Sequence, residues 1–299
     1  MKAFENAHKE IGDPFRMAID YMEIDAAAPD SRSYDNQRNL VENLKGGNAD
    51  KNSPASWSLC VDLKRCSPTP LSNGFRCEFS DAGSVANYFH ETHGASAVFA
   101  NIDSAAYNCN LDDLDSVIAA RARANPKPGK KLYSVIMKDI IVSRLQIALA
   151  KVHKADAVLL IACVLQEKLE EFMNLCTLVN MPFIVECHTP EEVGVAIENG
   201  AGIILVNRVD RVTGILHENQ GEAIINKMFP NKGAGGFVLL ATGGIRGIEE
   251  ARDLLSIGYD GVVLGKAVVG VSHEKVEKLA KSIVDGGGDF NLDEASEWE

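Results

Sequence analysis

The 299-residue chain lacks several patterns that would place it in other protein classes. It has no apolar run long enough to span a bilayer, so we expect no membrane-spanning helix. Its start, MKAFENAHKE, has neither the apolar core of a secretory signal nor the Ser/Arg-rich, acid-poor composition of a transit peptide. The seven cysteines show no CxxC or Cys/His metal-ligand spacing. We therefore expect no metal site, no cofactor and reduced thiols in a reducing compartment, either the cytoplasm or an organelle stroma or matrix.

Positive charge is also scarce. The chain has 30 Lys and Arg against 42 Asp and Glu, which gives a formal net charge of -12 at pH 7. Nucleic acids and anionic membranes both need a basic protein face, so we expect neither as a partner. A small anionic metabolite stays compatible with the sequence, because a few lysines in one pocket can reverse the sign locally.

Eight short apolar runs recur from residue 57 to residue 266, and nearly every one stops at a polar residue or glycine. They read SLCVDLK, SAVFANID, LYSVIMKD, AVLLIAC, PFIVECH, GIILVN, FVLLATGG and GVVLGK. Amphipathic helical stretches follow them at about 81–93, 111–124, 143–154, 166–179, 190–199, 218–229, 248–257 and 272–284. Buried strands that alternate with helices are typical of a parallel sheet covered on both faces. The pattern predicts an α/β fold, a (β/α)8 TIM barrel.

The barrel is expected over residues 55–285. Residues 1–54 are predicted to be an N-terminal extension, with a helix at 4–21 and a polar, irregular stretch at 25–54 that covers or braces the barrel. Residues 286–299, three glycines followed by acidic residues, are predicted to be a flexible acidic tail. Both segments lie outside the repeat, so they are where we expect any protein partner to bind.

In such a barrel the carboxyl ends of the strands meet at one mouth, where the chemistry takes place. Asp62 and Lys64 are two residues apart at the end of strand one, so both should face the mouth, and both are catalytic candidates. A structural ion pair that closes the barrel is the alternative. Lys138 follows an apolar run, and desolvation should lower its pKa and make it a proton donor near neutral pH. The alternative is a lysine whose charge reaches the surface.

Strand five ends at Glu186, whose pKa burial should raise unless a lysine lies close, and which suits an acid–base role opposite a lysine. His188 is interpreted as a loop or helix-entry residue rather than a catalytic one. Glycine turns follow the last two strands, and Lys266 comes directly after the second. Such turns offer backbone N–H groups to a phosphate, although they also occur for purely steric reasons. The phosphate candidates are Gly243, Gly244, Gly265 and Lys266.

The ordered motifs DLKRCSP, IMKDII, LLIA, VECHTPEE, VNR, GGI and LGKA resemble the indole-3-glycerol phosphate synthase family over residues 57–269. The resemblance implies ring closure and decarboxylation of 1-(2-carboxyphenylamino)-1-deoxyribulose 5-phosphate in tryptophan biosynthesis. It implies that Lys64 and Lys138 are the catalytic lysines, that Glu186 is the acid/base carboxylate and that Asn207 orients them. It also implies a phosphate site at Ser67, Gly244, Gly265 and Lys266, and Tyr107 against the anthranilate ring.

Several positions depart from the family pattern. Asp62 replaces a glutamate, and Val209 replaces the arginine of an Asn-x-Arg-Asp motif. Thr242 and Gly243 stand where a Ser-Glu-Ser-Gly motif has glutamate and serine. Each lost polar contact can cost roughly 2–4 kcal/mol of transition-state stabilisation. Three interpretations therefore stay open: an active lyase of this family, a weak or inactive homologue that serves as a subunit of a larger assembly, or another phosphosugar lyase or isomerase.

Overall fold

The computed structural model describes residues 36–45, 57–67, 77, 79–124, 131–230 and 236–265. In this part of the chain, eight parallel strands close into a barrel in sequence order, and the last strand pairs with the first. The strands are β1 (Ser58–Leu63), β2 (Ala97–Asn101), β3 (Ser134–Lys138), β4 (Ala157–Ile161), β5 (Phe183–Cys187), β6 (Ile203–Asn207), β7 (Val238–Thr242) and β8 (Gly261–Leu264). The predicted TIM barrel is confirmed.

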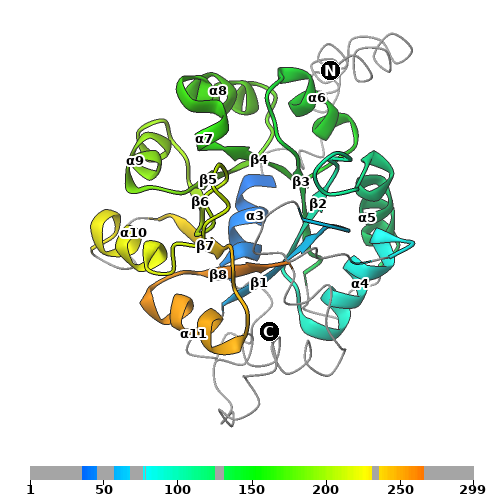
Figure 1. The fold of residues 1–299 in the computed structure, drawn as a ribbon. Helices are drawn as coiled ribbons and strands as arrows, with labels where there is room; N and C mark the ends of the chain where they lie inside the picture. Colours follow the sequence, from blue (N-terminus) through cyan, green and yellow to red (C-terminus); the bar gives the residue numbers. More distant parts are fainter. Residues whose placement is uncertain are drawn as a thin grey trace.

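Helices form an outer ring around the strands (Figure 1). They are α4 (Ala82–His93), α5 (Leu111–Arg123), α6 (Arg144–Val152), α7 (Ala162–Leu165), the 3₁₀ turn η2 (Gln166–Lys168), α8 (Leu169–Leu178), α9 (Pro190–Glu198), α10 (Gln220–Met228) and α11 (Ile248–Ile257). They match the predicted stretches closely, except that the stretch at 166–179 begins earlier and is divided at Gln166, where φ is 50°. The helices predicted at 4–21 and 272–284 and the tail at 286–299 lie outside the described residues.

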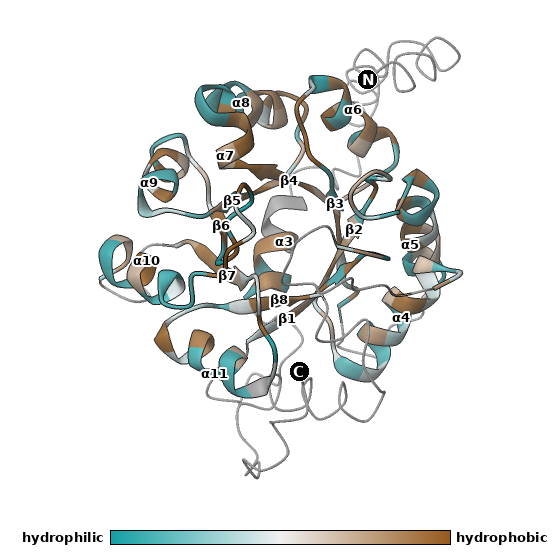
Figure 2. Ribbon diagram, in the orientation of Figure 1, coloured by the Kyte–Doolittle hydropathy of each residue, from teal (hydrophilic) through white to brown (hydrophobic). Residues whose placement is uncertain are grey.

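Strand side chains alternate between two apolar layers, as the period of two requires. Outward residues such as Val61, Val98 and Val185 are buried under the helices. Inward residues such as Phe99 and Leu205 fill the barrel itself. Figure 2 shows the matching pattern, with hydrophobic strands and hydrophobic inner sides on the surrounding helices. At the carboxyl ends of the strands, the residues at these inward positions line the mouth.

An additional helix, α3 (Asn36–Leu44), closes the amino-terminal end of the barrel. The prediction of an irregular stretch at 25–54 is wrong for these residues. Leu40 and Leu44 are buried against the inward-facing barrel residues. This burial favours a helix here even though most of the surrounding residues are polar. Asn43 Nδ2 donates to Ser134 Oγ at 2.9 Å, and Ser58 Oγ donates to the Asn43 carbonyl at 2.9 Å. Because β1 and β3 begin at these serines, α3 lies at the end of the barrel opposite the mouth.

No helix in the described ranges is both long enough and apolar enough to cross a membrane.

Candidate active site

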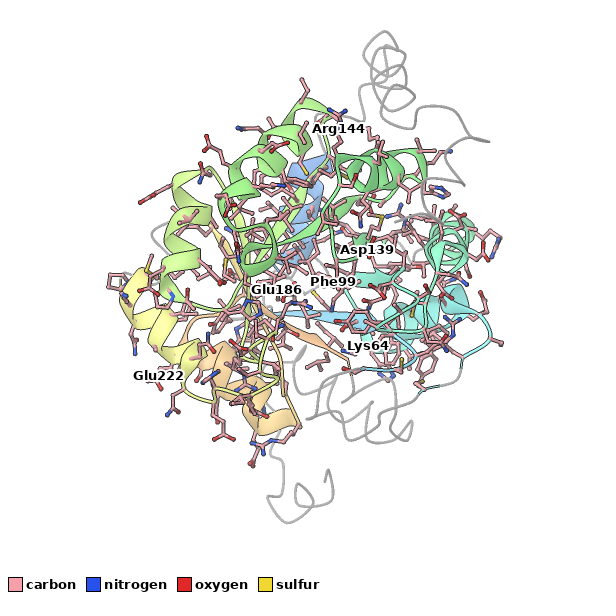
Figure 3. The ribbon with its side chains drawn as sticks, turned by 45° about the horizontal axis from the view of Figure 1, so that its top comes forward. Lys64, Phe99, Asp139, Arg144, Glu186 and Glu222 are labelled. Atoms are coloured by element: carbon pink, nitrogen blue, oxygen red, sulfur yellow. The ribbon has the colours of Figure 1, made fainter. Side chains whose placement is uncertain are left out.

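The polar groups of the mouth occupy the last inward positions of their strands. Asp62 follows the inward Cys60 on β1, and Glu186 follows the inward Ile184 on β5. Lys138 and Asn207 end β3 and β6 in the same phase. Figure 3 shows Lys64 and Glu186 toward the middle of the barrel with Phe99, whereas Arg144 and Glu222 lie at its edge. The structure thus brings all five predicted catalytic residues to one end of the barrel.

One set of charges is centred on Asp62, which is 4% exposed. Its Oδ2 lies 2.9 Å from Lys138 Nζ and 3.0 Å from Lys64 Nζ. Its Oδ1 accepts a hydrogen bond from Asn101 Nδ2 at 2.7 Å. Burial alone would raise the pKa of Asp62, but the two lysines outweigh it and hold that pKa well below its usual value. Asp62 is therefore an ionised carboxylate that fixes both lysines in the mouth.

Asp62 also overturns the expectation for Lys138. Desolvation does act to lower the pKa of Lys138, as predicted, but the charge of Asp62 outweighs it and the pKa is raised. The prediction of a lowered pKa is wrong because it took burial into account but not Asp62, the inward-facing carboxylate at the end of β1. In the free protein Lys138 keeps its proton.

A second set of charges is centred on Glu186, which is fully buried. Arg211 donates a hydrogen bond to each carboxylate oxygen, from Nε to Oε1 at 2.7 Å and from Nη2 to Oε2 at 2.9 Å. Asn207 Nδ2 donates to Oε1 at 3.0 Å. Burial acts to raise the pKa of Glu186, but Arg211 and His188 hold it well below its usual value. The expected raised pKa is wrong, because an arginine rather than a lysine lies against the carboxylate.

Arg211 contacts Glu186 but is not among the candidates predicted from the sequence. The family pattern has its arginine at the position of Val209, whereas this chain has one two residues later. Asp210 Oδ1 accepts from Val212 N at 2.9 Å, which helps form the turn that contains Arg211. Arg208 is not a substitute: it is 3% exposed and its Nη2 donates to Glu250 at 2.6 Å. The signal in the sequence was an arginine slightly out of register.

Tyr107 lies between the two sets. The Nζ atoms of Lys64 and Lys138 are 5.7 Å and 5.9 Å from its ring centroid. Its hydroxyl accepts a hydrogen bond from Arg211 Nη1 at 3.4 Å. The ring is thus within cation–π distance of both lysines, in the part of the mouth where the resemblance expects an aromatic side chain.

The glycines after β7 have steric reasons to be glycine. Gly243 and Gly244 have φ of 87° and 67°, in the left-handed region. A Cβ on Gly243 would lie 2.3 Å from Asn207 Oδ1, and one on Gly244 would lie 2.6 Å from Leu216 Cδ1. The serine that the family pattern has at Gly243 therefore does not fit this chain without moving Asn207.

The other phosphate candidates are placed less fully. Gly265 follows β8, and a Cβ there would lie 3.3 Å from Lys64 Nζ. Ser67 is half-buried after the end of β1. Lys266 lies outside the described residues. Phosphate binding by these groups stays a prediction.

His188 is more than a helix-entry residue. It precedes Thr189, whose Oγ1 accepts from Glu192 N at 3.1 Å and caps α9, as the sequence predicts. Its ring is nevertheless buried, with Nε2 3.4 Å from Glu186 Oε1. Burial lowers the pKa of His188, but its contacts with Cys163, Glu186 and Glu192 raise the pKa to about 11. In the part of the chain that the structure describes, Cys163, His188 and Glu192 are also the one group of three possible metal ligands whose ligand atoms all lie within 4.8 Å of one another.

Comparison with known proteins shows which family the chain belongs to. The profile of the indole-3-glycerol phosphate synthase family matches residues 13–282. The chain belongs to that family. The indole-3-glycerol phosphate synthase of Mycobacteroides abscessus is 30% identical over 213 residues, which is 71% of each chain. That of Syntrophobacter fumaroxidans is 33% identical over 213 residues, 71% of this chain and 73% of the relative.

Among solved structures, thiamine phosphate pyrophosphorylase from Pyrococcus furiosus is similar with a TM-score of 0.50. It is 18% identical, and the match covers 76% of this chain and 93% of the other. At this identity the likeness concerns the barrel fold alone. The family membership rests on the sequence relatives.

Proposed function

We propose that this chain is an active indole-3-glycerol phosphate synthase, which converts 1-(2-carboxyphenylamino)-1-deoxyribulose 5-phosphate into indole-3-glycerol phosphate, carbon dioxide and water. The observation that supports it most is the pairing of two charge sets across Tyr107. The Asp62 set supplies two lysines, of which Lys138 has a raised pKa, and the Glu186 set supplies an ionised carboxylate. Acid and base groups thus face the same space, as a condensation followed by a dehydration needs.

In the first step the ring carbon that bears the carboxylate attacks the ketone carbon of the sugar. Lys138 donates a proton to the ketone oxygen as the new carbon–carbon bond forms. The bond to the carboxylate then breaks, carbon dioxide leaves, and the released electron pair restores the aromatic ring. Asp62, 2.9 Å from Lys138, holds the ammonium charged and in place for this transfer.

The second step removes water. Lys64 protonates the hydroxyl group formed in the first step, and Glu186 takes the proton from the adjacent carbon, so that a double bond forms in the new ring. A carboxylate with a low pKa is ionised and able to accept that proton at neutral pH. Asn207 and Arg211 hold Glu186 in one orientation, which is the preorganisation that efficient proton transfer needs.

Arg211 compensates for Val209 in this proposal. The substrate is an anion with a carboxylate and a phosphate, so the mouth needs cations besides the lysines. The guanidinium of Arg211 is held at both Glu186 and Tyr107. Ser67, Gly243, Gly244, Gly265 and Lys266 are proposed to bind the phosphate.

The reducing compartment proposed from the sequence, cytoplasm or an organelle stroma or matrix, agrees with seven free cysteines. The alternative of an inactive subunit of an assembly has no support in the described residues. The two segments at which we expected a partner, 1–54 and 286–299, lie outside them except for α3.

The test is to incubate the protein with the carboxyphenylamino-deoxyribulose phosphate and to measure the formation of indole-3-glycerol phosphate. We expect the wild type to be active, and Glu186→Gln and Lys138→Met each to lower kcat by at least about 10²-fold. Glu191→Gln and Lys227→Met are the matched controls, because these side chains are 72% and 60% exposed and pair with each other. A wild type that binds the compound but releases no product would refute the proposal.

A further inference from the structure

A thiol, an imidazole and a carboxylate lie close together beside Glu186. Cys163 lies in α7 after β4, His188 follows β5, and Glu192 lies in the first turn of α9. The strands β4 and β5 pair with Ile161 opposite Glu186, so the residues two positions further along each chain come together. One ligand atom from each of Cys163, His188 and Glu192 lies within 4.8 Å of the other two.

These three donors are the types that zinc takes in proteins: a sulfur, an imidazole nitrogen and a carboxylate oxygen. Around one tetrahedral zinc, nitrogen, oxygen and sulfur ligands are roughly 3.3–3.6 Å apart, from the usual metal–ligand distances. His188 Nδ1 and Glu192 Oε2 already lie 3.4 Å apart. Cys163 and Glu192 are partly exposed, which leaves an entry path from solvent.

The surroundings of His188 also fit a metal ligand. When one nitrogen of a histidine binds a metal, the other usually points at a carboxylate or carbonyl that fixes the ring. Here Nδ1 faces Glu192, while Nε2 lies 3.4 Å from Glu186 Oε1. The nearby cation Arg211 is bound to Glu186 through two nitrogens. The His188 ring therefore lies between two carboxylates, of which Glu186 is paired with Arg211.

We propose that Cys163, His188 and Glu192 form a binding site for a zinc-class divalent cation, with water as the fourth ligand. The site adjoins the mouth through His188 but contains none of the groups assigned to proton transfer. It does not depend on the proposed function, because binding is measured directly and turnover can be measured separately on metal-free protein.

The experiment is a titration of chelator-treated wild-type protein with Co²⁺, read by the near-ultraviolet thiolate-to-cobalt absorption band, followed by displacement with Zn²⁺. We expect one equivalent to bind. Cys163→Ser should weaken binding at least tenfold and abolish the thiolate band. Cys66→Ser is the matched control, because Cys66 is also half-buried and its Sγ lies against the Ala106 carbonyl at 3.4 Å. It should bind as the wild type does.

A thermal unfolding curve for Cys163→Ser, compared with that of Cys66→Ser, shows whether the variant is folded. The proposal is overturned if the folded wild type gives no thiolate band and retains no zinc. It is equally overturned if Cys163→Ser binds the metal as tightly as the wild type does.

Discussion

The two ends of the barrel use the same inward-facing positions for opposite purposes. At the amino-terminal end these positions are apolar, and Leu40 and Leu44 of α3 are packed against them. At the carboxyl end the next inward positions have buried charges, Asp62 and Glu186. Burying charge costs free energy unless each group is paired, which Lys138 and Arg211 accomplish here. The difference teaches that one end stabilises the fold while the other holds a costly, preorganised arrangement of charges.

Asp62→Ala should break this comparison most strongly, because the buried Asp62 pairs two half-buried lysines and lies in the mouth. Removing one partner of a buried ion pair costs roughly 3–5 kcal/mol of unfolding free energy, and the lysines would lose their positions. We expect a loss of this size in urea unfolding together with a large fall in kcat. The comparison variant Asp62→Glu, which has the family's residue, should keep most of both. Equal damage from both variants would show that the carboxylate is not what matters.

Gly243→Ala should have a smaller effect, confined to the carboxyl end. The added Cβ would meet Asn207 Oδ1, and φ of 87° is strained for alanine. We expect a stability loss of about 1–3 kcal/mol and a lower kcat, because Asn207 orients Glu186.

Gly200→Ala is the control for Gly243→Ala, since Gly200 has φ of 91° but no atom within 4 Å of its added Cβ. It should lose stability through strain alone and keep kcat. If both variants have the same kcat, the contact with Asn207 has no role in catalysis.

The smallest expected effect is on how the unfolding free energy changes at acidic pH. The pKa of Asp62 is lower in the folded protein than in the unfolded chain, so the unfolded state takes up a proton first as pH falls. The stabilisation from Asp62 is therefore complete above about pH 4, the unfolded value, and is lost progressively below it. Acid unfolding of the wild type should be steeper below that pH than that of Asp62→Asn. Parallel curves would mean that Asp62 is not ionised in the fold.

Much of the fold could be predicted from the sequence, because each apolar run is short, near-continuous and followed by an amphipathic stretch. The inward direction of Asp62 and Lys64 also followed from alternation alone. The helix α3 could not be found in this way, since its leucines are buried only by residues that are distant in sequence.

The electrostatics of the site were less predictable for a related reason. The pKa directions of Lys138 and Glu186 depend on which charges face them across the barrel, and burial alone gave the wrong sign for both. Arg211 was missed because it follows the Asn-x-Arg-Asp motif positions, and only the turn after β6 places it against Glu186. Cys163 and His188 are 25 residues apart on neighbouring strand ends, so no local spacing indicated that they meet.

The division between the two ends is tested most directly by measuring unfolding free energy and kcat together for Leu44→Ala and Glu186→Gln. Leu44, the last residue of α3, is fully buried at the amino-terminal end of the barrel. Truncating its side chain should therefore lower the unfolding free energy by about 2–5 kcal/mol and leave kcat of the folded protein near the wild-type value. Glu186→Gln should do the reverse, with turnover of the carboxyphenylamino-deoxyribulose phosphate almost abolished and the protein still folded. A Glu186→Gln variant with wild-type kcat, or a folded Leu44→Ala variant without activity, would contradict the account.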